Sequence, residues 1–346
     1  MDRRYVIIGA GAIGGAVGAV LTRTDIPTVL VARGRHAETL ASAGLTLMTP
    51  DGTHHTWVTA VSGAEQLRLT PDDVLVFTTK TQQLEVALQQ WVDQPVHGPG
   101  GVLGTAGDLL PALTALNGVA AEEKALRYFR RVFGVCVWLP AVHLEPGEVI
   151  VRSWPLLGQF HIGRWPAPLG TPADAQFLNG LAATWTAAGI RTSVVDDVAP
   201  WKYNKLLSNL ANAAGALTAD GADLSHVAAA LRAEGEYVLR YAGIEFVSFE
   251  ISTAARADGP TLRPVPGRNT GPSNSTWQSL SRNTGNVETD FFNGEIVRLA
   301  HRHGIEAPIN AALARVARST VRNGLGASPY SAAQLAELLG IDATSD

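Results

Sequence analysis

The first two hundred residues alternate short apolar runs with amphipathic or small-residue stretches. Short apolar runs bounded by polar residues are typical of strands buried in a parallel sheet. We place the strands and helices of this half in segments 5–8, 27–32, 72–80, 102–120, 131–138, 148–151, 159–162 and 190–195. The two pieces near residues 150 and 160 lie beside Pro-Gly and Gly-Arg turns, so we expect antiparallel pairing there. The pattern predicts an α/β domain.

From residue 201 onward, apolar positions recur at the helical spacing of three and four residues. The preceding residues 196–200, Asp-Asp-Val-Ala-Pro, are typical of a linker. Predicted helices cover 201–218, 222–243, 276–283, 287–303, 309–322 and 331–339. A chain of this length usually forms two domains. We therefore expect an α/β domain over residues 1–197 and an all-α domain over residues 198–346.

Residues 257–275 form a predicted loop that is rich in Pro and Gly. A loop of this length inside a compact domain is usually functional or disordered. Arg263 or Arg268 could meet an anionic substrate, and solvent exposure explains each of them at least as well. The pattern leaves the role of this loop open.

Composition and charge argue against some classes of binding partner. The 346 residues carry 27 Lys and Arg against 31 Asp and Glu, and the two signs are interspersed. This distribution argues against nucleic acid or an anionic membrane as the main partner. The single cysteine, Cys136, cannot form an internal disulfide, and no apolar run approaches the roughly 20 residues of a membrane span. The N-terminal apolar stretch runs into a glycine pattern without a cleavage site, so we expect a cytoplasmic protein.

The glycine pattern follows the first apolar run directly. Gly9, Gly11 and Gly14 form a G-x-G-x-x-G between a predicted strand and a helix of small residues. In a dinucleotide-binding turn the first glycine permits the tight turn, the second lets the backbone approach a pyrophosphate, and the third lets helix and strand pack closely. The helix that starts with Ala12 and Ile13 would then face the phosphates. The α/β domain is therefore predicted to be of the Rossmann type.

The residue after the second strand indicates which dinucleotide binds. Enzymes that use NAD place Asp or Glu there to accept hydrogen bonds from the ribose 2′-hydroxyl. This chain has Arg33-Gly34-Arg35-His36 instead. A cation at this point would pair with a 2′-phosphate, so we expect NADP(H), although a solvated loop charge is the alternative. Lys80 ends the third strand of the series and could reach a cofactor phosphate or ribose, or lie on the surface.

An unusual polar stripe marks the start of the second half, WKYNKLLSNLAN at residues 201–212. Lys205, Ser208, Asn209 and Asn212 recur there at helical spacing. Asn is a poor helix former, so two of them in line with a lysine suggest a binding surface. Glu288 begins a later helix, where a carboxylate is also expected from the helix dipole alone. The histidine pairs 54–55 and 301–303 have the wrong spacing for a shared metal, and we expect no metal site.

These motifs together resemble the ketopantoate reductase (2-dehydropantoate 2-reductase) family over nearly the whole chain. The matching blocks are GAGAIGG at 9–15, TTK at 78–80, LNG at 116–118, PGEV at 146–149, KLLSN at 205–209, STWQSL at 275–280 and ETDFFNGEIVRLAHRHGIEAPIN at 288–310. The resemblance implies a Rossmann domain, a helical C-terminal domain, an active site in the cleft between them, NADPH as reductant and a possible homodimer.

The resemblance also implies roles for individual residues. For the cofactor, these are Gly9, Gly11, Ala12, Ile13, Gly14, Arg33, Lys80 and Asn117. For the substrate, they are Asn117, Asn209, Asn212 and Ser275, with Lys205 and Glu288 as catalytic residues. The sequence departs from the family pattern at Tyr203, usually Trp, and at Leu116, usually Gln. Many members place the second asparagine at the position of Ala213, and whether Asn212 replaces it stays open.

The resemblance implies NADPH-dependent reduction of a small 2-oxo acid, 2-dehydropantoate, to pantoate. Hydride delivery to the 2-oxo carbon builds charge on its oxygen, and Lys205 is our candidate for the proton donor. One alternative is a related reductase that acts on another bulky 2-oxo acid or a cyclic imine in a secondary pathway. A second alternative is a non-catalytic NADP(H)-binding protein, which would not need Lys205 and Glu288.

Overall fold

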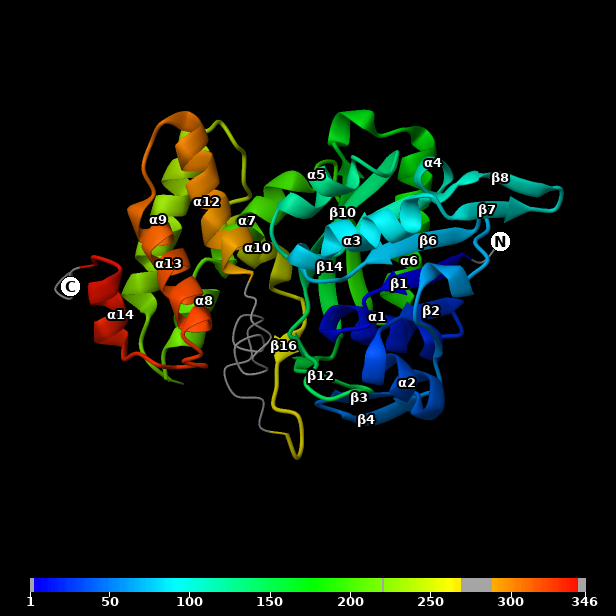
Figure 1. Cartoon of the computed structure of the whole chain (residues 1–346), viewed down its shortest axis with the longest axis horizontal. Coiled ribbons are helices and arrows are strands. Elements are labelled where there is room, and N and C mark those ends of the chain that lie inside the picture. The colour runs from blue at the N-terminus through cyan, green and yellow to red at the C-terminus, as the bar shows by residue number, and fades with distance from the viewer. Residues whose placement is uncertain (1–2, 220, 269–287, 342–346) are drawn as a thin grey trace. The chain divides into compact units, whose positions relative to one another are not determined.

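The computed structural model describes residues 3–219, 221–268 and 288–341, and they form two compact units (Figure 1). The first unit contains the described residues up to Trp201 and those from Glu250 to Arg268. The second contains the described residues from Lys202 to Phe249 and those of the C-terminal segment. Among the described residues, no helix is long and apolar enough to cross a membrane.

The first unit is built on an eight-stranded sheet in the order β15-β14-β10-β9-β6-β1-β2-β5. Its strands are β1 (Arg4–Ile8), β2 (Thr28–Val31), β5 (Thr59–Val61), β6 (Asp73–Phe77), β9 (Pro111–Thr114), β10 (Arg131–Trp138), β14 (Gly158–Trp165) and β15 (Ile190–Val194). The six strands from β5 to β10 are parallel and follow the Rossmann order, while β14 is antiparallel to β10. This confirms the predicted Rossmann-type domain. The loops after β1 and β6 lie at the point where the strand order reverses, which is the usual ligand site.

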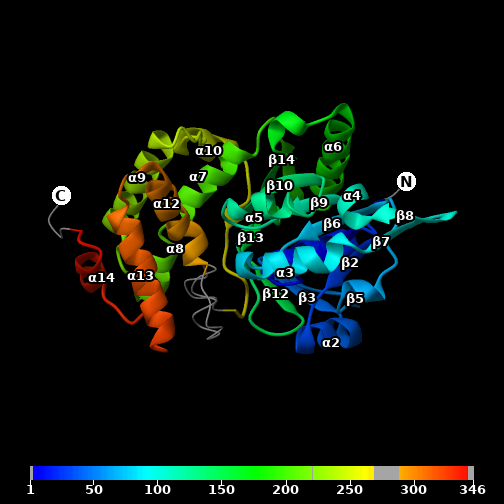
Figure 2. The same cartoon turned by 45° about the horizontal axis from the view of Figure 1, so that its top comes forward.

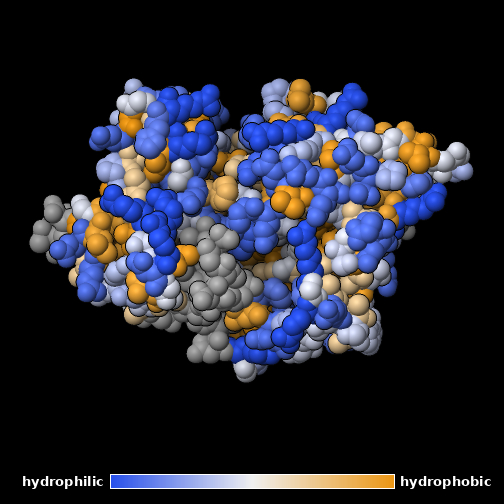
Figure 3. All heavy atoms as spheres, viewed as in Figure 1, coloured by the Kyte–Doolittle hydropathy of each residue, from blue (hydrophilic) through white to orange (hydrophobic). Residues whose placement is uncertain are grey.

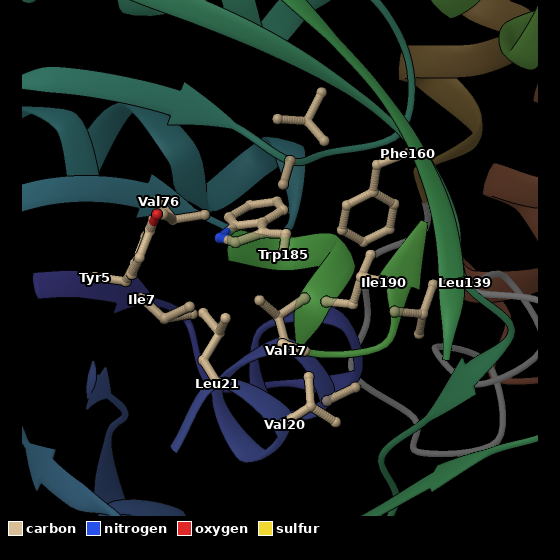
Figure 4. Packing of buried hydrophobic residues seen from close by; sticks show 14 of the residues in the cluster. Tyr5, Ile7, Val17, Val20, Leu21, Val76, Leu139, Phe160, Trp185 and Ile190 are labelled. Carbon is tan, nitrogen blue, oxygen red and sulfur yellow. The ribbon is translucent and has the colours of Figure 1, made fainter. Parts of the chain in front are cut away.

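Alternate residues of the central strands supply two hydrophobic cores, one on each face of the sheet. Tyr5 and Ile7 of β1 pack with α1 (Ala12–Arg23) and α6 (Pro172–Ala187). Figure 4 shows Trp185 of α6 in this core, close to Phe160, with their ring centroids 5.7 Å apart. Val6 and Ile8 face the opposite core, which contains α3 (Thr81–Val92), α4 (Ala106–Leu109) and α5 (Ala120–Ala125). The sheet is therefore covered by helices on both faces.

Smaller elements extend the first unit. They are α2 (Gly34–Ala43), η1 (Ala64–Gln66), η2 (Ala167–Leu169), α10 (Phe249–Arg256), β3 (Leu45–Thr49), β4 (Gly52–Thr56), β7 (Pro95–Gly98), β8 (Gly101–Thr105), β11 (Ala141–Val142), β12 (Glu148–Val151), β13 (Ser153–Trp154) and β16 (Thr261–Leu262). A second sheet has the order β11-β12-β3-β4, and β12 is antiparallel to β11 and parallel to β3. The β7–β8 hairpin projects from the unit and exposes Val102 and Leu103, in a region where apolar atoms gather in Figure 3.

The second unit is helical (Figure 2). Its helices are α7 (Ala199–Asn209), which begins in the first unit, α8 (Asn212–Leu217), α9 (Ser225–Tyr241), α12 (Thr289–His303), α13 (Pro308–Arg322) and α14 (Ala332–Leu338). Gly235 lets α9 approach its neighbours closely, because a Cβ there would lie 2.8 Å from Leu207 and 3.7 Å from Ile296. The predicted helix 276–283 lies outside the described residues.

One predicted helix is wrong. The sequence pattern gives a single helix over 201–218, whereas the structure breaks it at residues 210–211 between α7 and α8. The break is stabilised from outside, because the side-chain amide of Asn293 on α12 donates to the carbonyl oxygen of Leu210 at 3.0 Å. Asn293 also donates to Asn310 at 2.8 Å, and Asn310 donates to Glu234 at 2.9 Å. A buried polar network therefore joins the α7–α8 break to α12, α13 and α9.

The predicted linker and loop also have local structure. The amide of Ala199 donates to Asp197 at 2.8 Å, so the segment 196–200 starts a helix. Within the 257–275 segment, β16 pairs with β13, Arg263 stacks on Trp154 at 3.6 Å, and Arg268 donates to Glu148 at 2.8 Å. These contacts lie within the first unit. The domain boundary expected between residues 197 and 198 stays a prediction.

We expect Asn293→Ala to lower the free energy of unfolding by about 2–3 kcal/mol, because it leaves the buried Leu210 carbonyl and the Asn310 side chain without their donor. Denaturant unfolding of the two proteins measures this difference. Asn323→Ala is the control, since Asn323 is exposed and its side-chain amide donates to the Ser319 hydroxyl at 3.3 Å; its effect should stay within about 0.5 kcal/mol. Equal effects of the two substitutions would contradict the structural role of the network.

Candidate dinucleotide and substrate sites

The turn between β1 and α1 is held from two sides. The amides of Gly9 and Ala10 both donate to the carbonyl oxygen of Val31 at 3.0 Å, which ties the turn to the end of β2. The hydroxyl of Thr78, directly after β6, donates to the carbonyl oxygen of Gly9 at 2.7 Å. The turn is therefore fixed to both strands that flank β1.

The three glycines of the motif have different surroundings. Gly9 has φ +103°, a conformation that favours glycine. A Cβ on Gly14 would lie 2.3 Å from the Gly9 carbonyl oxygen and 2.4 Å from the Thr78 hydroxyl, so only glycine lets α1 begin this close to β1. A Cβ on Gly11 would meet nothing within 4 Å, so packing within the chain does not require glycine there. Open space at Gly11 fits a ligand phosphate that lies against the backbone.

The start of α1 completes this part of the site. Ala12 and Ile13 are half-buried in the first turn of α1, and no side chain caps the helix at Gly11. The first amides of a helix lack partners within the helix and attract anions. The turn therefore has the chemistry of a pyrophosphate site.

Two cations follow the neighbouring strands at the same edge of the sheet. Arg33 follows β2 as the residue before α2, and its exposed side chain donates to Gln90 at 2.7 Å. Lys80 follows β6 as the residue before α3, and it is half-buried. Because β1, β2 and β6 are parallel neighbours, both residues lie at the carboxyl edge where the glycine turn lies.

His36 is a functional candidate that the sequence did not single out. Its Nε2 lies 2.7 Å from the carbonyl oxygen of Ala10, and its Nδ1 accepts a hydrogen bond from the amide of Gly147 at 3.0 Å. The two bonds together require a neutral ring with the proton on Nε2. Burial lowers the pKa of His36, which favours that form. The ring therefore links the glycine turn to Gly147, which directly precedes β12. In the sequence, His36 stands out only because it follows Arg33 by three residues.

Asn117 lies after β9, at the same edge of the parallel sheet, and is half-buried. Leu116, which replaces the usual glutamine of the resembled family, is buried in the core that contains α3 and α5. The neighbouring Thr114 hydroxyl donates to Glu122 of α5 at 2.7 Å. At residue 116, where the resembled family usually has glutamine, this chain therefore has an apolar side chain that packs in the core next to Asn117 in the sequence.

The second unit carries the polar stripe. Lys205 and Asn209 lie one turn apart on α7, and Asn212 begins α8 beyond the break. Asn209 is only 6% exposed, and its side-chain Nδ2 has no hydrogen-bond partner among the described residues. A buried amide donor without an acceptor is costly, at about 1–3 kcal/mol, and native structures rarely leave one unused. The Asn209 amide is thus a buried donor that remains available for a hydrogen bond.

Glu288 is 5% exposed and directly precedes α12, and its side chain does not cap that helix. Five residues later, the side-chain amide of Asn293 donates to the carbonyl oxygen of Leu210, between α7 and α8. Through this bond α12 contacts the chain directly after Asn209. Ser275 lies outside the described residues. Within the described parts of the chain, no three His, Cys, Asp or Glu side chains are grouped to hold a metal ion.

Another buried titratable residue, His161 of β14, was also missed by the sequence reasoning. Burial, with Arg191 and Arg256 nearby, lowers the pKa of His161 to about 4. Its ring stacks on Trp201 with the centroids 3.8 Å apart. The ring is therefore neutral near pH 7, and Trp201 lies four residues before Lys205.

Comparison with known families gives two matches that together cover most of the chain. Residues 5–167 match the family described as ketopantoate reductase PanE/ApbA, and residues 197–320 match its C-terminal region.

Individual relatives agree with this assignment. The chain is 27% identical to 2-dehydropantoate 2-reductase of Pyrococcus horikoshii over 320 residues, which cover 89% of this chain and 94% of the relative. It is 28% identical to the Caulobacter vibrioides protein of the same name over 313 residues, 88% and 94% of the two chains. A solved PanE/ApbA family ketopantoate reductase of Ralstonia eutropha has a TM-score of 0.72 at 25% identity, with 93% and 99% covered. D-mandelate dehydrogenase in complex with NADH and anilino(oxo)acetate has the same TM-score and coverage at 19% identity, which indicates a shared fold.

We expect Gly11→Ala and Gly14→Ala to separate binding from folding. The new Cβ at residue 11 projects into open space, so the free energy of unfolding should change by less than about 0.5 kcal/mol while the dissociation constant for NADPH rises at least about tenfold. The Cβ at residue 14 meets backbone and Thr78, so unfolding should become easier by about 1–3 kcal/mol. Fluorescence titration and denaturant unfolding measure the two effects. Normal NADPH binding by Gly11→Ala would rule out the proposed phosphate position.

Proposed function

Because the chain belongs to the ketopantoate reductase family, we propose that it reduces 2-dehydropantoate to pantoate with NADPH, with Lys205 as the proton donor. The first unit would bind the dinucleotide, and the second would provide the proton donor and most of the substrate contacts. The observation that carries the substrate assignment is the buried, unpartnered amide of Asn209 one turn after Lys205.

The dinucleotide assignment rests on the glycine turn. Gly11 leaves open space at the start of α1, and the first amides of that helix can donate to phosphate oxygens. Arg33 stands where an NAD enzyme would have a carboxylate, and a guanidinium suits a 2′-phosphate better than a hydroxyl. Lys80 and Asn117 lie after neighbouring parallel strands and would contact the ribose and the nicotinamide side of the cofactor.

When bound, the reduced nicotinamide supplies a hydride to the C2 carbon of the 2-oxo acid. Lys205 would donate a proton from its Nζ to the C2 oxygen, so that one hydride and one proton convert the ketone to a hydroxyl. The Asn209 amide would donate to an oxygen of the substrate, and Asn212, at the start of α8, would add a second amide. Positioned donors of this kind stabilise charge as it develops on oxygen.

Glu288 and Ser275 complete the proposed set. Glu288, buried at the start of α12, would accept a hydrogen bond from the substrate hydroxyl or from Lys205. Ser275 would hold the substrate carboxylate, as the family resemblance implies. Both roles are tested by the effect of substitution on KM for the 2-oxo acid.

Two other functions make different demands on the same residues. A reductase for another bulky 2-oxo acid or a cyclic imine would use the same turn and Lys205 with a different substrate contact. The departures at Leu116 and at Asn212 are the features of this chain that favour it. A non-catalytic binding protein would bind NADPH without oxidising it. A panel of 2-oxo acids and cyclic imines, with NADPH oxidation followed at 340 nm, distinguishes the three functions.

We expect Lys205→Ala to lower kcat by about 10²- to 10⁴-fold, because the developing oxyanion loses its proton donor, while the dissociation constant for NADPH stays nearly unchanged. Steady-state kinetics with 2-dehydropantoate and NADPH titration measure the two quantities. Arg322→Ala is the control for loss of a cation, since Arg322 is exposed in the last turn of α13 and lies outside the polar stripe, and its kcat should stay within about twofold. Near-normal turnover by Lys205→Ala would remove Lys205 from the mechanism.

We expect Arg33→Ala to raise KM for NADPH by about 10- to 100-fold and to leave KM for NADH within about twofold, because a charge-assisted phosphate contact contributes about 1.5–3 kcal/mol. The measurement is the KM for both cofactors in both proteins. Arg68→Ala serves as the control, since Arg68 is exposed and precedes β6, at the opposite edge of the sheet. Equal KM values for NADPH and NADH in the unmodified enzyme would contradict the role of Arg33.

A further inference from the structure

The β10–β14 ladder presents three successive residue pairs on one face of the first unit. The strands are antiparallel, and alternate pairs along the ladder share a face. The three pairs are Gly134 with Gly163, Cys136 with His161, and Trp138 with Gln159. Each pair contacts a segment that leaves or re-enters the first unit.

The glycine pair receives Val198, which is fully buried. A Cβ on Gly134 would lie 2.8 Å from a methyl carbon of Val198, and a Cβ on Gly163 would lie 3.1 Å from its Cβ. Both values are shorter than ordinary packing distances, so the two glycines leave the space that Val198 occupies. The residue just before α7 is thereby packed into the sheet.

The middle pair holds Trp201 in the first turn of α7. The His161 ring is nearly parallel to the indole, with an interplanar angle of 13° and centroids 3.8 Å apart. The Cys136 thiol donates to the carbonyl oxygen of Trp201 at 3.4 Å. Because His161 is neutral, the stack buries no charge. One pair of residues therefore contacts both the side chain and the backbone of Trp201.

The last pair holds the end of α10. The Gln159 side-chain amide donates to the Ala255 carbonyl oxygen at 2.7 Å, and the Arg256 guanidinium lies 4.0 Å from the Trp138 ring centroid. A Cβ on Gly259 would lie 2.5 Å from the Gln159 side-chain oxygen, so the chain after α10 also packs against this pair. The chain leaves the first unit after Trp201 and returns to it at Glu250. The ladder thus contacts the segment that ends at Trp201 and the segment that begins at Glu250.

We propose that Cys136 and His161 are positioning residues for the reaction, which hold the first turn of the helix that carries Lys205. The inference rests on the proposed role of Lys205 as proton donor. In an α-helix each carbonyl accepts from the amide four residues later, and the residue four after Trp201 is Lys205. The carbonyl that Cys136 contacts is therefore the helical acceptor for the Lys205 amide. A displacement of about 1 Å at a catalytic group can cost about 10²-fold in rate.

Four variants test this inference in the full-length protein. Cys136→Ala removes the thiol donor, and Cys136→Ser restores a donor of similar size. His161→Ala removes the stacked ring, and His161→Phe restores a flat ring. We expect Cys136→Ala to lower kcat about three- to tenfold and His161→Ala about 10- to 100-fold, with the dissociation constant for NADPH unchanged. Each restoring variant should recover most of the lost kcat.

Hydrogen–deuterium exchange gives a readout that does not depend on activity. Peptides that cover residues 202–206 should exchange faster in Cys136→Ala and His161→Ala than in the unmodified protein, and close to normally in the two restoring variants. Leu181→Ala is the control for general destabilisation, because Leu181 is buried on α6 in the core of the first unit. Measured well below its melting temperature, this variant should keep normal kcat and normal exchange over 202–206.

The outcomes separate the two proposals. Unchanged kcat and unchanged exchange in Cys136→Ala and His161→Ala would overturn the positioning role, as would an equal loss of kcat in Leu181→Ala. If Lys205→Ala keeps normal turnover while the exchange over 202–206 still responds, the proposed proton donor fails and the positioning role in catalysis fails with it. Loss of kcat with faster exchange, and recovery of both in the restoring variants, supports the positioning role.

Discussion

The close contact between the start of α1 and the central strands is the constraint on which the first unit depends. Gly14 has no Cβ, so the helix begins against the Gly9 carbonyl and Thr78. The same helix presents Gly15 to Val149 of β12 and Gly18 to Leu30 of β2, where a Cβ would lie 2.8 Å and 2.2 Å from those side chains. One helix of small residues therefore fixes the dinucleotide turn, the main sheet and the second sheet together.

In the second unit, a break between two helices determines where Asn209 and Asn212 lie. The α7–α8 break ends one helix at Asn209 and starts the next at Asn212, and it persists because Asn293 binds the freed carbonyl of Leu210. Without the break, residues 209 and 212 would continue one helical stripe. Buried hydrogen bonds between side-chain amides and the backbone favour one arrangement of the segments that they join. As a result, Asn209 is the last residue of α7 and Asn212 is the first residue of α8.

The elements that depend on patterns of neighbouring residues could be predicted from the sequence. The apolar runs of β1, β2, β6 and β15, the glycine turn and most helices of the second unit lie within a few residues of their predicted positions. The break at Leu210 could not be predicted, because its hydrogen-bond donor, Asn293, is 83 residues away in the sequence. The role of His36 depends in the same way on Gly147, which is 111 residues away. Contacts between distant segments decide these features, and a single sequence carries no sign of them.

The His36 contact also limits how the proposed preference for NADPH could be redesigned. Arg33, the proposed contact of the 2′-phosphate, is exposed and donates to Gln90 at 2.7 Å, and its neighbour Arg35 is also exposed. His36 follows directly, yet its ring joins the Ala10 carbonyl to the Gly147 amide and belongs to the scaffold. A loop transplanted from an NAD enzyme would have to supply both a carboxylate at position 33 and an equivalent bridge at position 36. The proposed phosphate contact of Arg33, directly before α2, and the structural contact of His36, in the first turn of α2, thus lie three residues apart.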